Sequence, residues 1–232
     1  MIGIICAMKI EAEGIIALCE NTNTNTYAGI NFTSGTLHGK AVVIAVCGVG
    51  KVNASMCALT MIEKYNPKAV INSGVAGAVS PLLRVGDIVV AEKSVEHDMN
   101  TTALGDKQGE ISFPDGNVMF FDCDEKVSNL LTKVCKNIPN TNVLSGIIAS
   151  GDLFVSAVEQ RLKIQERFNA LACEMEGAAI GHVCYCCKIP YGIIRAISDD
   201  LTENEGMDFI KFTDLASKKT VEAMSNFVKD YA

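Results

Sequence analysis

The sequence lacks the features of a nucleic-acid-binding or membrane-spanning protein. Only four of its 232 residues are arginine, and the formal net charge is -7, so there is no basic stripe of the kind that contacts nucleic acid. The apolar run 41–50 is closed by Gly48, Gly50 and Lys51, well short of the ~20 residues that a helix needs to cross a bilayer. We therefore expect neither a nucleic-acid partner nor a membrane partner.

Segments that separate domains or direct export are also missing. No internal repeat, low-complexity tract or linker rich in Pro, Gly or Ser interrupts the sequence, which predicts one domain over residues 1–232. The first residues, Met-Ile-Gly-Ile-Ile-Cys-Ala-Met-Lys, have no basic leader before the apolar part, which favours a first strand over a signal peptide. We expect a well-buried globular protein of the cytoplasm.

The ten cysteines lack the spacing of a zinc site. Most lie inside apolar segments, such as Cys6 in Ile-Ile-Cys-Ala and Cys47 in Ala-Val-Cys-Gly, which is typical of small buried hydrophobic residues in a reducing compartment. The cluster at 182–187, His-Val-Cys-Tyr-Cys-Cys, has no paired Cys-x-x-Cys. We expect no metal here.

Short β-rich runs alternate with helical patterns along the chain. The predicted strands are 2–6, 30–36, 40–46, 69–72, 86–94, 143–150, 171–174 and 191–198. The predicted helices are 10–20, 51–65, 124–137, 157–168, 177–187 and 208–231. This alternation predicts an α/β fold with a mixed central sheet flanked by helices. In such sheets ligands bind beyond the carboxyl ends of the strands, so the informative residues should follow strands.

Two glycine-rich stretches are expected to follow strands. The turn 47–53, Cys-Gly-Val-Gly-Lys-Val-Asn, resembles a phosphate loop, but Ala45 and Val52 stand where a Walker motif needs Gly and Ser or Thr. Asn53 stands where the Rossmann fingerprint needs its third glycine. The stretch 72–78, Asn-Ser-Gly-Val-Ala-Gly-Ala, either lets backbone approach a ligand closely or is a simple turn.

Acidic residues follow two further predicted strands. Glu11 comes after the first one, where an acid also suits an ordinary helix start. Glu174 and Glu176 lie in the otherwise apolar run 172–180. Because burying a charge is costly unless it is paired or hydrogen-bonded, these two acids call for an explanation.

A buried cation is predicted beside these acids. Arg195 lies inside the apolar strand 191–198 and needs an anionic partner. Glu174 either pairs with Arg195 or supports the site from behind. The same strand ends in Ser198 and Asp199, and a helix N-cap explains only one of the polar residues there.

Seven short motifs occur in the order found in one enzyme family. They are Gly-Ile-Ile-x-Ala-Met-x-x-Glu, Gly-Val-Gly-Lys-Val, Asn-x-Gly-x-Ala-Gly, Val-Gly-Asp-Ile-Val-Val, Ser-Gly-Asp-x-Phe, Glu-Met-Glu and Arg-Ala-Ile-Ser-Asp. The sequence thereby resembles the 5′-methylthioadenosine/S-adenosylhomocysteine nucleosidases of the nucleoside phosphorylase family. The resemblance implies the nucleoside phosphorylase fold and a role in methionine salvage. It also implies hydrolysis of the N-glycosidic bond of 5′-substituted adenosines, including 5′-deoxyadenosine, to adenine and the substituted ribose.

The resemblance also implies roles for individual residues. Glu11 corresponds to the carboxylate that activates water, and Asp199, supported by Ser198, to the acid that protonates adenine at N7. Met175 and Glu176 correspond to the pair that binds ribose. The further substrate contacts that it implies are Gly77 and Val155 through their backbone, the aromatics Phe154 and Phe209, and the apolar Met8 and Val49.

The chemistry is coherent with these residues. Glycoside hydrolysis passes through an oxocarbenium-like sugar, which nearby negative charge stabilises. Adenine leaves poorly as an anion, so an acid must protonate it, and water needs a base. Glu11, Glu176 and Asp199 can fill these roles without a cofactor. A phosphorylase needs cationic or backbone donors for phosphate, usually arginine. The loop after the first predicted strand has no arginine, and Glu11 there would repel phosphate and suit water.

Departures from the family pattern leave the substrate and the exact reaction open. Val75 replaces a common serine, and Thr101 and Leu104 replace a valine and a phenylalanine. In the family the segment 97–105 reaches the neighbouring subunit's site, so the resemblance implies a homodimer. The 5′-group stays open among methylthio, homocysteinyl, deoxy and futalosine-type substituents. The pattern also fits a purine nucleoside phosphorylase, or a nucleoside-binding module without turnover.

Overall fold

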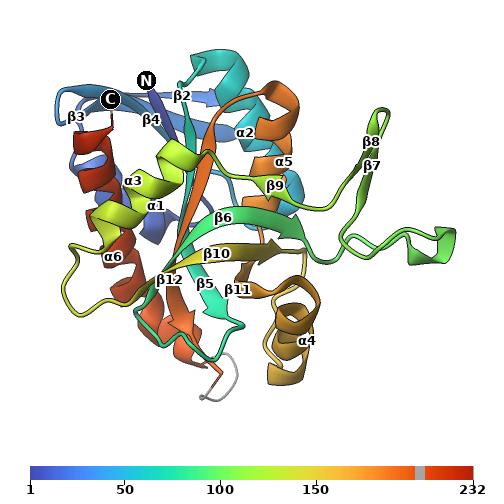
Figure 1. The fold of residues 1–232 in the computed structure, drawn as a ribbon. Coiled ribbons are helices and arrows are strands. Elements are labelled where there is room, and N and C mark those ends of the chain that lie inside the picture. Colours follow the sequence, from blue (N-terminus) through green and yellow to red (C-terminus); the bar gives the residue numbers. More distant parts are fainter. Residues whose placement is uncertain (202–206, 232) are drawn as a thin grey trace.

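One mixed β-sheet runs through the molecule and carries helices on both faces (Figure 1). The computed structural model describes residues 1–201 and 207–231, with side chains from 212 onwards in the second stretch. The strands of this sheet are β1 (Ile2–Cys6), β2 (Glu20–Tyr27), β3 (Ile30–Leu37), β4 (Lys40–Val46), β5 (Val70–Ala78), β6 (Ile88–Glu96), β9 (Phe121–Asp122), β10 (Val143–Ser150), β11 (Ala170–Glu174) and β12 (Tyr191–Asp199). The helices are α1 (Lys9–Ala17), α2 (Lys51–Tyr65), α3 (Glu125–Cys135), α4 (Val158–Phe168), α5 (Gly177–Cys187) and α6 (Met207–Asp230).

The strand order explains why several strand ends meet. It is β11-β10-β6-β12-β5-β1-β4-β3-β2, with β9 paired to β6. Strand β5 is parallel to both β1 and β12, and β10 is parallel to both β6 and β11. Strand β12 is antiparallel to β6, and β2, β3 and β4 form an antiparallel meander. The predicted α/β fold with a mixed sheet is confirmed.

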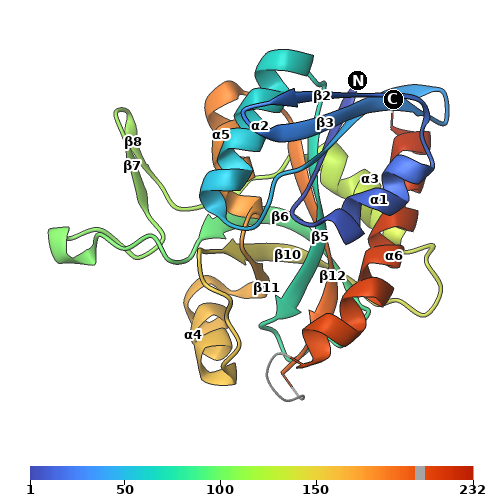
Figure 2. The same ribbon diagram turned by 180° about the vertical axis from the view of Figure 1, so that it is seen from behind.

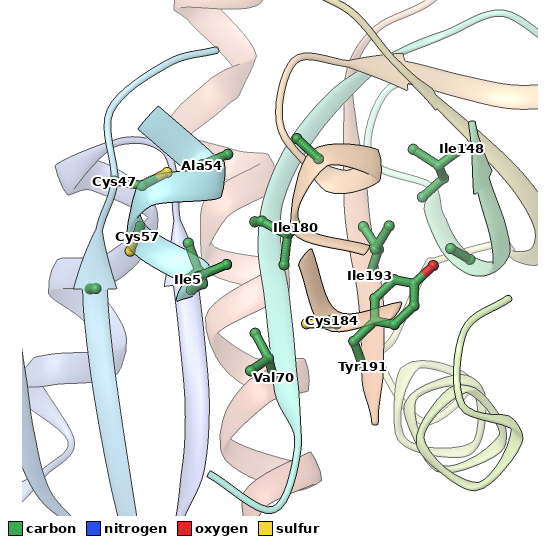
Figure 3. Close-up of a cluster of buried hydrophobic side chains, with 14 of the residues drawn as sticks. Ile5, Cys47, Ala54, Cys57, Val70, Ile148, Ile180, Cys184, Tyr191 and Ile193 are labelled. Atoms are coloured by element: carbon green, nitrogen blue, oxygen red, sulfur yellow. The ribbon is translucent and has the colours of Figure 1, made fainter. Parts of the chain in front are cut away.

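Two apolar layers cover the sheet. On one face α2 and α5 pack against the strands, and on the other α1, α3 and α6 do so. Figure 3 shows the first layer, to which α2 contributes Cys57, α5 contributes Ile180, and the sheet contributes Ile5 and Ile193. Burying a side chain such as isoleucine contributes roughly 1.5–3 kcal/mol, so these layers fix the strands that carry the polar residues.

Most elements match the prediction, and the differences have physical causes. Elements β1, β4, α2, β10 and α5 begin and end at the predicted residues. The predicted helix 10–20 is wrong at its end, because α1 stops at Ala17 and the exposed strand β2 begins at Glu20. Its alternating Asn and Thr residues pair with β3 at the sheet edge, and such a strand has no apolar periodicity by which to detect it. The stretch 72–78 lies within β5 and is not a turn.

A short arm stands away from the sheet. It contains the 3-10 helix η1 (Thr102–Leu104) and a hairpin of β7 (Ile111–Phe113) and β8 (Gly116–Val118) (Figures 1 and 2). None of these three elements was predicted. Among the helices that the structure describes, none is long and apolar enough to cross a bilayer.

Candidate active site

A cavity of about 360 Å³ opens where the strands end. Its walls come from the residues after β1 and β4, from the ends of β5, β11 and β12, from the segments after β10 and β11, and from Arg161 on α4. Nine residues singled out from the sequence line it: Met8, Glu11, Val49, Gly77, Phe154, Val155, Met175, Glu176 and Asp199. Glu174 also lines it, whereas the side chain of Phe209 lies outside the described residues.

Glu11 serves both its helix and the cavity. Its Oε2 accepts the N–H groups of Ala7 at 2.9 Å and Met8 at 2.8 Å, so it caps the start of α1 as a helix-start acid does. Its Oε1 accepts the N–H of Val75 at 3.1 Å. Burial raises the pKa of Glu11, and Arg195 and these backbone donors oppose the rise. The carboxyl group is thereby fixed at the cavity wall with a raised proton affinity.

Gly74 leaves the space that Glu11 occupies. A Cβ at this position would lie 2.6 Å from Glu11 Oε1, closer than real side chains tolerate. The small residues of β5 therefore admit a protein carboxylate at Gly74. Val75, which replaces the family's common serine, lines the cavity beside it.

Glu176 is the N-cap residue of α5, and its carboxylate faces the cavity. Its Oε1 accepts the N–H of Gly50 at 2.9 Å. Burial, reinforced by the neighbouring Glu174, raises the pKa of Glu176 to about 8. The described contacts supply no cation to this carboxylate, so it keeps affinity for a proton or for hydroxyl donors.

The loop that resembles a phosphate loop binds carboxylates. Gly50, at φ 98°, directs its N–H to Glu176, and the next N–H, that of Lys51, reaches Asp152 Oδ1 at 2.8 Å. The Lys51 ammonium pairs with Asp98 Oδ1 at 2.7 Å. Backbone donors that a nucleotide-binding loop directs to phosphate are here engaged by acidic side chains.

Glu174 and Arg195 form a buried ion pair behind the cavity. Glu174 Oε2 also accepts the N–H groups of Glu176 at 3.0 Å and Gly177 at 2.8 Å. Arg195 donates to the backbone and side-chain oxygens of Asn72 as well. Of the two roles left open for Glu174, pairing with Arg195 is therefore the one that the structure adopts, and the pair holds the start of α5.

Asp199 is held by a second arginine that sequence analysis missed. Ser198 Oγ donates to Asp199 Oδ1 at 2.7 Å, and Arg161 Nη2 donates to Oδ2. Arg161 also donates from Nε to the Val155 carbonyl at 2.9 Å and approaches the Asp200 carbonyl at 3.5 Å. The predicted acid is thus half of an ion pair.

The spacing of residues along α4 could have identified Arg161 as buried. Helix α4 buries Arg161, Ile164 and Phe168, which are spaced by three and four residues and so share one helix face. An arginine in register with two apolar residues predicts a buried cation that needs an anionic partner.

The described cysteines and acids do not assemble into a metal centre. All ten cysteines are free thiols, and burial raises the pKa of Cys173, beside the cavity, to about 12. Across the side chains of residues 1–201 and 212–231, no group of three or more His, Cys, Asp or Glu is arranged to hold a metal ion.

Comparison with known proteins identifies the family. A model of the Phosphorylase superfamily matches residues 1–229. The chain belongs to the phosphorylase superfamily. It is 37% identical over 209 residues to a 5′-methylthioadenosine/S-adenosylhomocysteine nucleosidase of Shewanella loihica, covering 90% of each chain. It is also 37% identical over 211 residues to an aminodeoxyfutalosine nucleosidase of Campylobacter jejuni, covering 91% of this chain and 90% of the relative.

A solved structure agrees over the same length. The S-adenosylhomocysteine nucleosidase of Streptococcus pyogenes, in complex with 5-methylthiotubericidin, superposes with a TM-score of 0.93 at 31% identity. The match covers 100% of this chain and 97% of that one. The nucleoside phosphorylase-like fold implied by the motifs is therefore confirmed.

Proposed function

We propose that the protein hydrolyses the N-glycosidic bond of 5′-substituted adenosines, such as 5′-methylthioadenosine, S-adenosylhomocysteine and 5′-deoxyadenosine. The observation that carries the proposal is that Glu11, Glu176 and Asp199 border one cavity. This set supplies a base, a sugar ligand and an acid. The free thiols suit a reducing compartment, so we place the enzyme in the cytoplasm. Because 5′-methylthioadenosine is a proposed substrate, we assign the reaction to methionine salvage.

Adenine is proposed to leave at Asp199. This carboxylate lies directly against Gly77, where a Cβ would lie 2.9 Å from Oδ2, so the missing side chain leaves room for the carboxylate at the cavity wall. A proton passed from Asp199 to N7 converts adenine into a neutral leaving group. Val155 supplies backbone, and the half-exposed Phe154 supplies a ring at the cavity mouth.

The sugar is proposed to lie between Glu176, Met175 and Glu11. Ribose hydroxyls can donate to the free positions of the Glu176 carboxylate, and Met175 offers an adaptable apolar surface. The raised pKa of Glu11 suits it to take the proton of the attacking water. Negative charge at both acids stabilises the cationic sugar of the transition state.

Water fits this site better than phosphate does. A phosphate dianion needs cations or clustered backbone donors. The two buried arginines near the cavity, Arg161 and Arg195, are engaged by Asp199 and Glu174. Glu11 stands at the position of attack and would repel an anion.

The 5′-substituent is proposed to extend towards Met8 and Val49. Both line the cavity, and Val49 is half exposed, so a methylthio or a longer group can be accommodated there. The equal identity of the Campylobacter jejuni relative favours a futalosine-type nucleoside as the second candidate substrate.

A homodimer is part of the same proposal. Leu104, in the segment 97–105, is 83% exposed on the arm, and α2 exposes Val52, Met56 and Leu59. An exposed apolar face of this kind is typical of an interaction surface. A second copy seated there would bring its 97–105 segment to the 5′-end of this site. Light scattering should give twice the mass of one chain.

The reaction itself can be tested with a panel of nucleosides. Methylthioadenosine, adenosylhomocysteine, 5′-deoxyadenosine and inosine are incubated with the protein, with and without phosphate, and the free base is measured. Adenine release that does not depend on phosphate supports the nucleosidase. Phosphate dependence would identify a phosphorylase, and binding without turnover a sensing module.

The acid is tested by Asp199→Asn. The amide keeps the shape of the side chain but cannot give up a carboxylic proton. Removal of a general acid reduces turnover by about 10²–10⁴-fold, so adenine release should become that much slower. Unchanged release would show that Asp199 is not the acid.

A further inference from the structure

Arg161 reaches the cavity from outside the sheet. It lies on α4, is only 4% exposed, and lines the cavity beside Asp199. Its Nε donates to the Val155 carbonyl at 2.9 Å, while Nη2 donates to Asp199 Oδ2. One rigid guanidinium therefore links the acid proposed to protonate adenine with the backbone proposed to face it.

Two protein donors fix the position of the Asp199 carboxylate. Its Oδ1 accepts from Ser198 Oγ at 2.7 Å and its Oδ2 from Arg161, so both oxygens have protein donors. On the side of β5, a Cβ at Gly77 would lie 2.9 Å from Oδ2 and 3.4 Å from Arg161 Cζ. The ion pair thus packs directly on a glycine backbone at the cavity wall.

A guanidinium fork sets the spacing of the two acceptors that it bridges, because its donors are planar and rigid. Adenine presents N7 and the neighbouring 6-amino group along one edge, and this edge needs two protein groups at a defined separation. Asp199 and the Val155 carbonyl are such groups. A lysine would supply the charge without fixing the separation.

We propose that Arg161 is a positioning residue for departure of the base. This role rests on the nucleosidase function proposed above. Arg161 aligns Asp199 and the Val155 carbonyl with the N7 and 6-amino edge of the purine. Among the described contacts Arg161 binds Asp199 and two backbone carbonyls, and neither Glu11 nor Glu176, so we expect its effect to be confined to the step that needs a protonated leaving group.

Two substrates separate this role from a merely structural one. Methylthioadenosine needs protonation of its base, whereas a 5-methylthioriboside of p-nitrophenol loses a stable anion without a proton. For Arg161→Met we expect kcat on methylthioadenosine to fall about 10–100-fold, a part of what general acid catalysis contributes. On the p-nitrophenyl substrate we expect less than about a threefold change, because positioning of the acid is not used there.

Three further variants separate the positioning role of Arg161 from loss of charge or loss of folding. Arg161→Lys keeps the charge and loses the fork, and should fall between the wild type and Arg161→Met on methylthioadenosine alone. In an Asp199→Asn background, Arg161→Met should slow adenine release by less than about threefold, because residues acting as a unit are not additive. Arg167→Met, an exposed arginine on the same helix, should match the wild type.

The outcomes are distinguishable from failure of the proposed function. If the wild type releases no adenine from methylthioadenosine, the nucleosidase proposal fails. If it does release adenine, and the Arg161 variants slow both substrates equally or neither, only the positioning role is overturned. An additive loss in the Asp199→Asn background would overturn it too.

Discussion

The cavity holds two kinds of buried acid. Asp199 and Glu174 each pair with a buried arginine, whereas Glu11 and Glu176 receive only backbone N–H groups in the described contacts. A directly bonded cation fixes the orientation of a carboxylate. Burial raises the pKa of Glu11 and Glu176, and Arg195, which forms an ion pair with neither, only opposes this rise. The paired acids are therefore held in orientation, and the unpaired ones keep affinity for protons and hydroxyl groups.

The largest expected effect comes from the unpaired acid that faces the water. Glu11→Gln keeps an oxygen to accept backbone N–H groups but cannot take a proton from water. Loss of a general base reduces turnover by about 10³–10⁴-fold at the upper end of its range, measured as adenine release at substrate saturation. Glu13→Gln changes an exposed acid on the same helix and serves as the control. Activity within tenfold of the wild type would remove Glu11 from the base role.

The Glu174–Arg195 pair should instead reveal itself in stability. Arg195→Met leaves Glu174 as an uncompensated buried charge, which costs about 3–5 kcal/mol. Urea denaturation measures this loss in the free energy of unfolding. Arg167→Met, at an exposed site, should change it by less than about 0.5 kcal/mol. A small loss for Arg195→Met would mean that Asn72 and the backbone alone hold the strand end.

The unpaired Glu176 should make the ligand-free protein less stable as pH rises. Its folded-state pKa is about 8, against about 4.3 in an unfolded chain. Between these values the folded state holds a proton that the unfolded state has released, so the free energy of unfolding falls with increasing pH and levels off above about 8.

Glu176→Gln removes this titration. The stability of the variant relative to the wild type should rise between about pH 4.3 and 8, by about 5 kcal/mol in total at pH 9. Denaturation at pH 5, 7 and 9 measures the difference. A wild-type minus variant difference that is constant across these pH values would show that Glu176 is already ionised in the empty site.

The sequence predicted the strand-end residues of the cavity better than it predicted their partners. Glu11, Glu176 and Asp199 follow β-rich runs, and parallel topology brings such ends to one edge of a sheet. Arg161 comes from a helix that packs against that edge, and only tertiary structure brings it to Asp199. Its apolar register with Ile164 and Phe168 predicts burial, and it does not identify the acid with which it pairs.

The same limit applies to the fold. The apolar periodicity of the buried strands and helices predicts them correctly, because their apolar faces pack into the two core layers. Strand β2 and the arm at 102–118 bury little of their own surface, so no pattern marks them. Their existence depends on pairing with a neighbour, which a local reading of the sequence does not contain.

The smallest effect should come from the hydroxyl beside each paired acid. Ser198 Oγ donates to Asp199, and Ser150 Oγ donates to Glu174. A hydrogen bond to a charged group contributes about 1.5 kcal/mol, so Ser198→Ala should lower kcat for methylthioadenosine by about tenfold with little change in KM. Ser150→Ala loosens a pair that touches no leaving group, so it should lower stability by a similar energy and leave kcat within about threefold. Equal kinetic losses in the two variants would contradict the division of roles between the two arginine-paired acids. In that case Asp199 would not be the one that acts on adenine while Glu174 holds the fold.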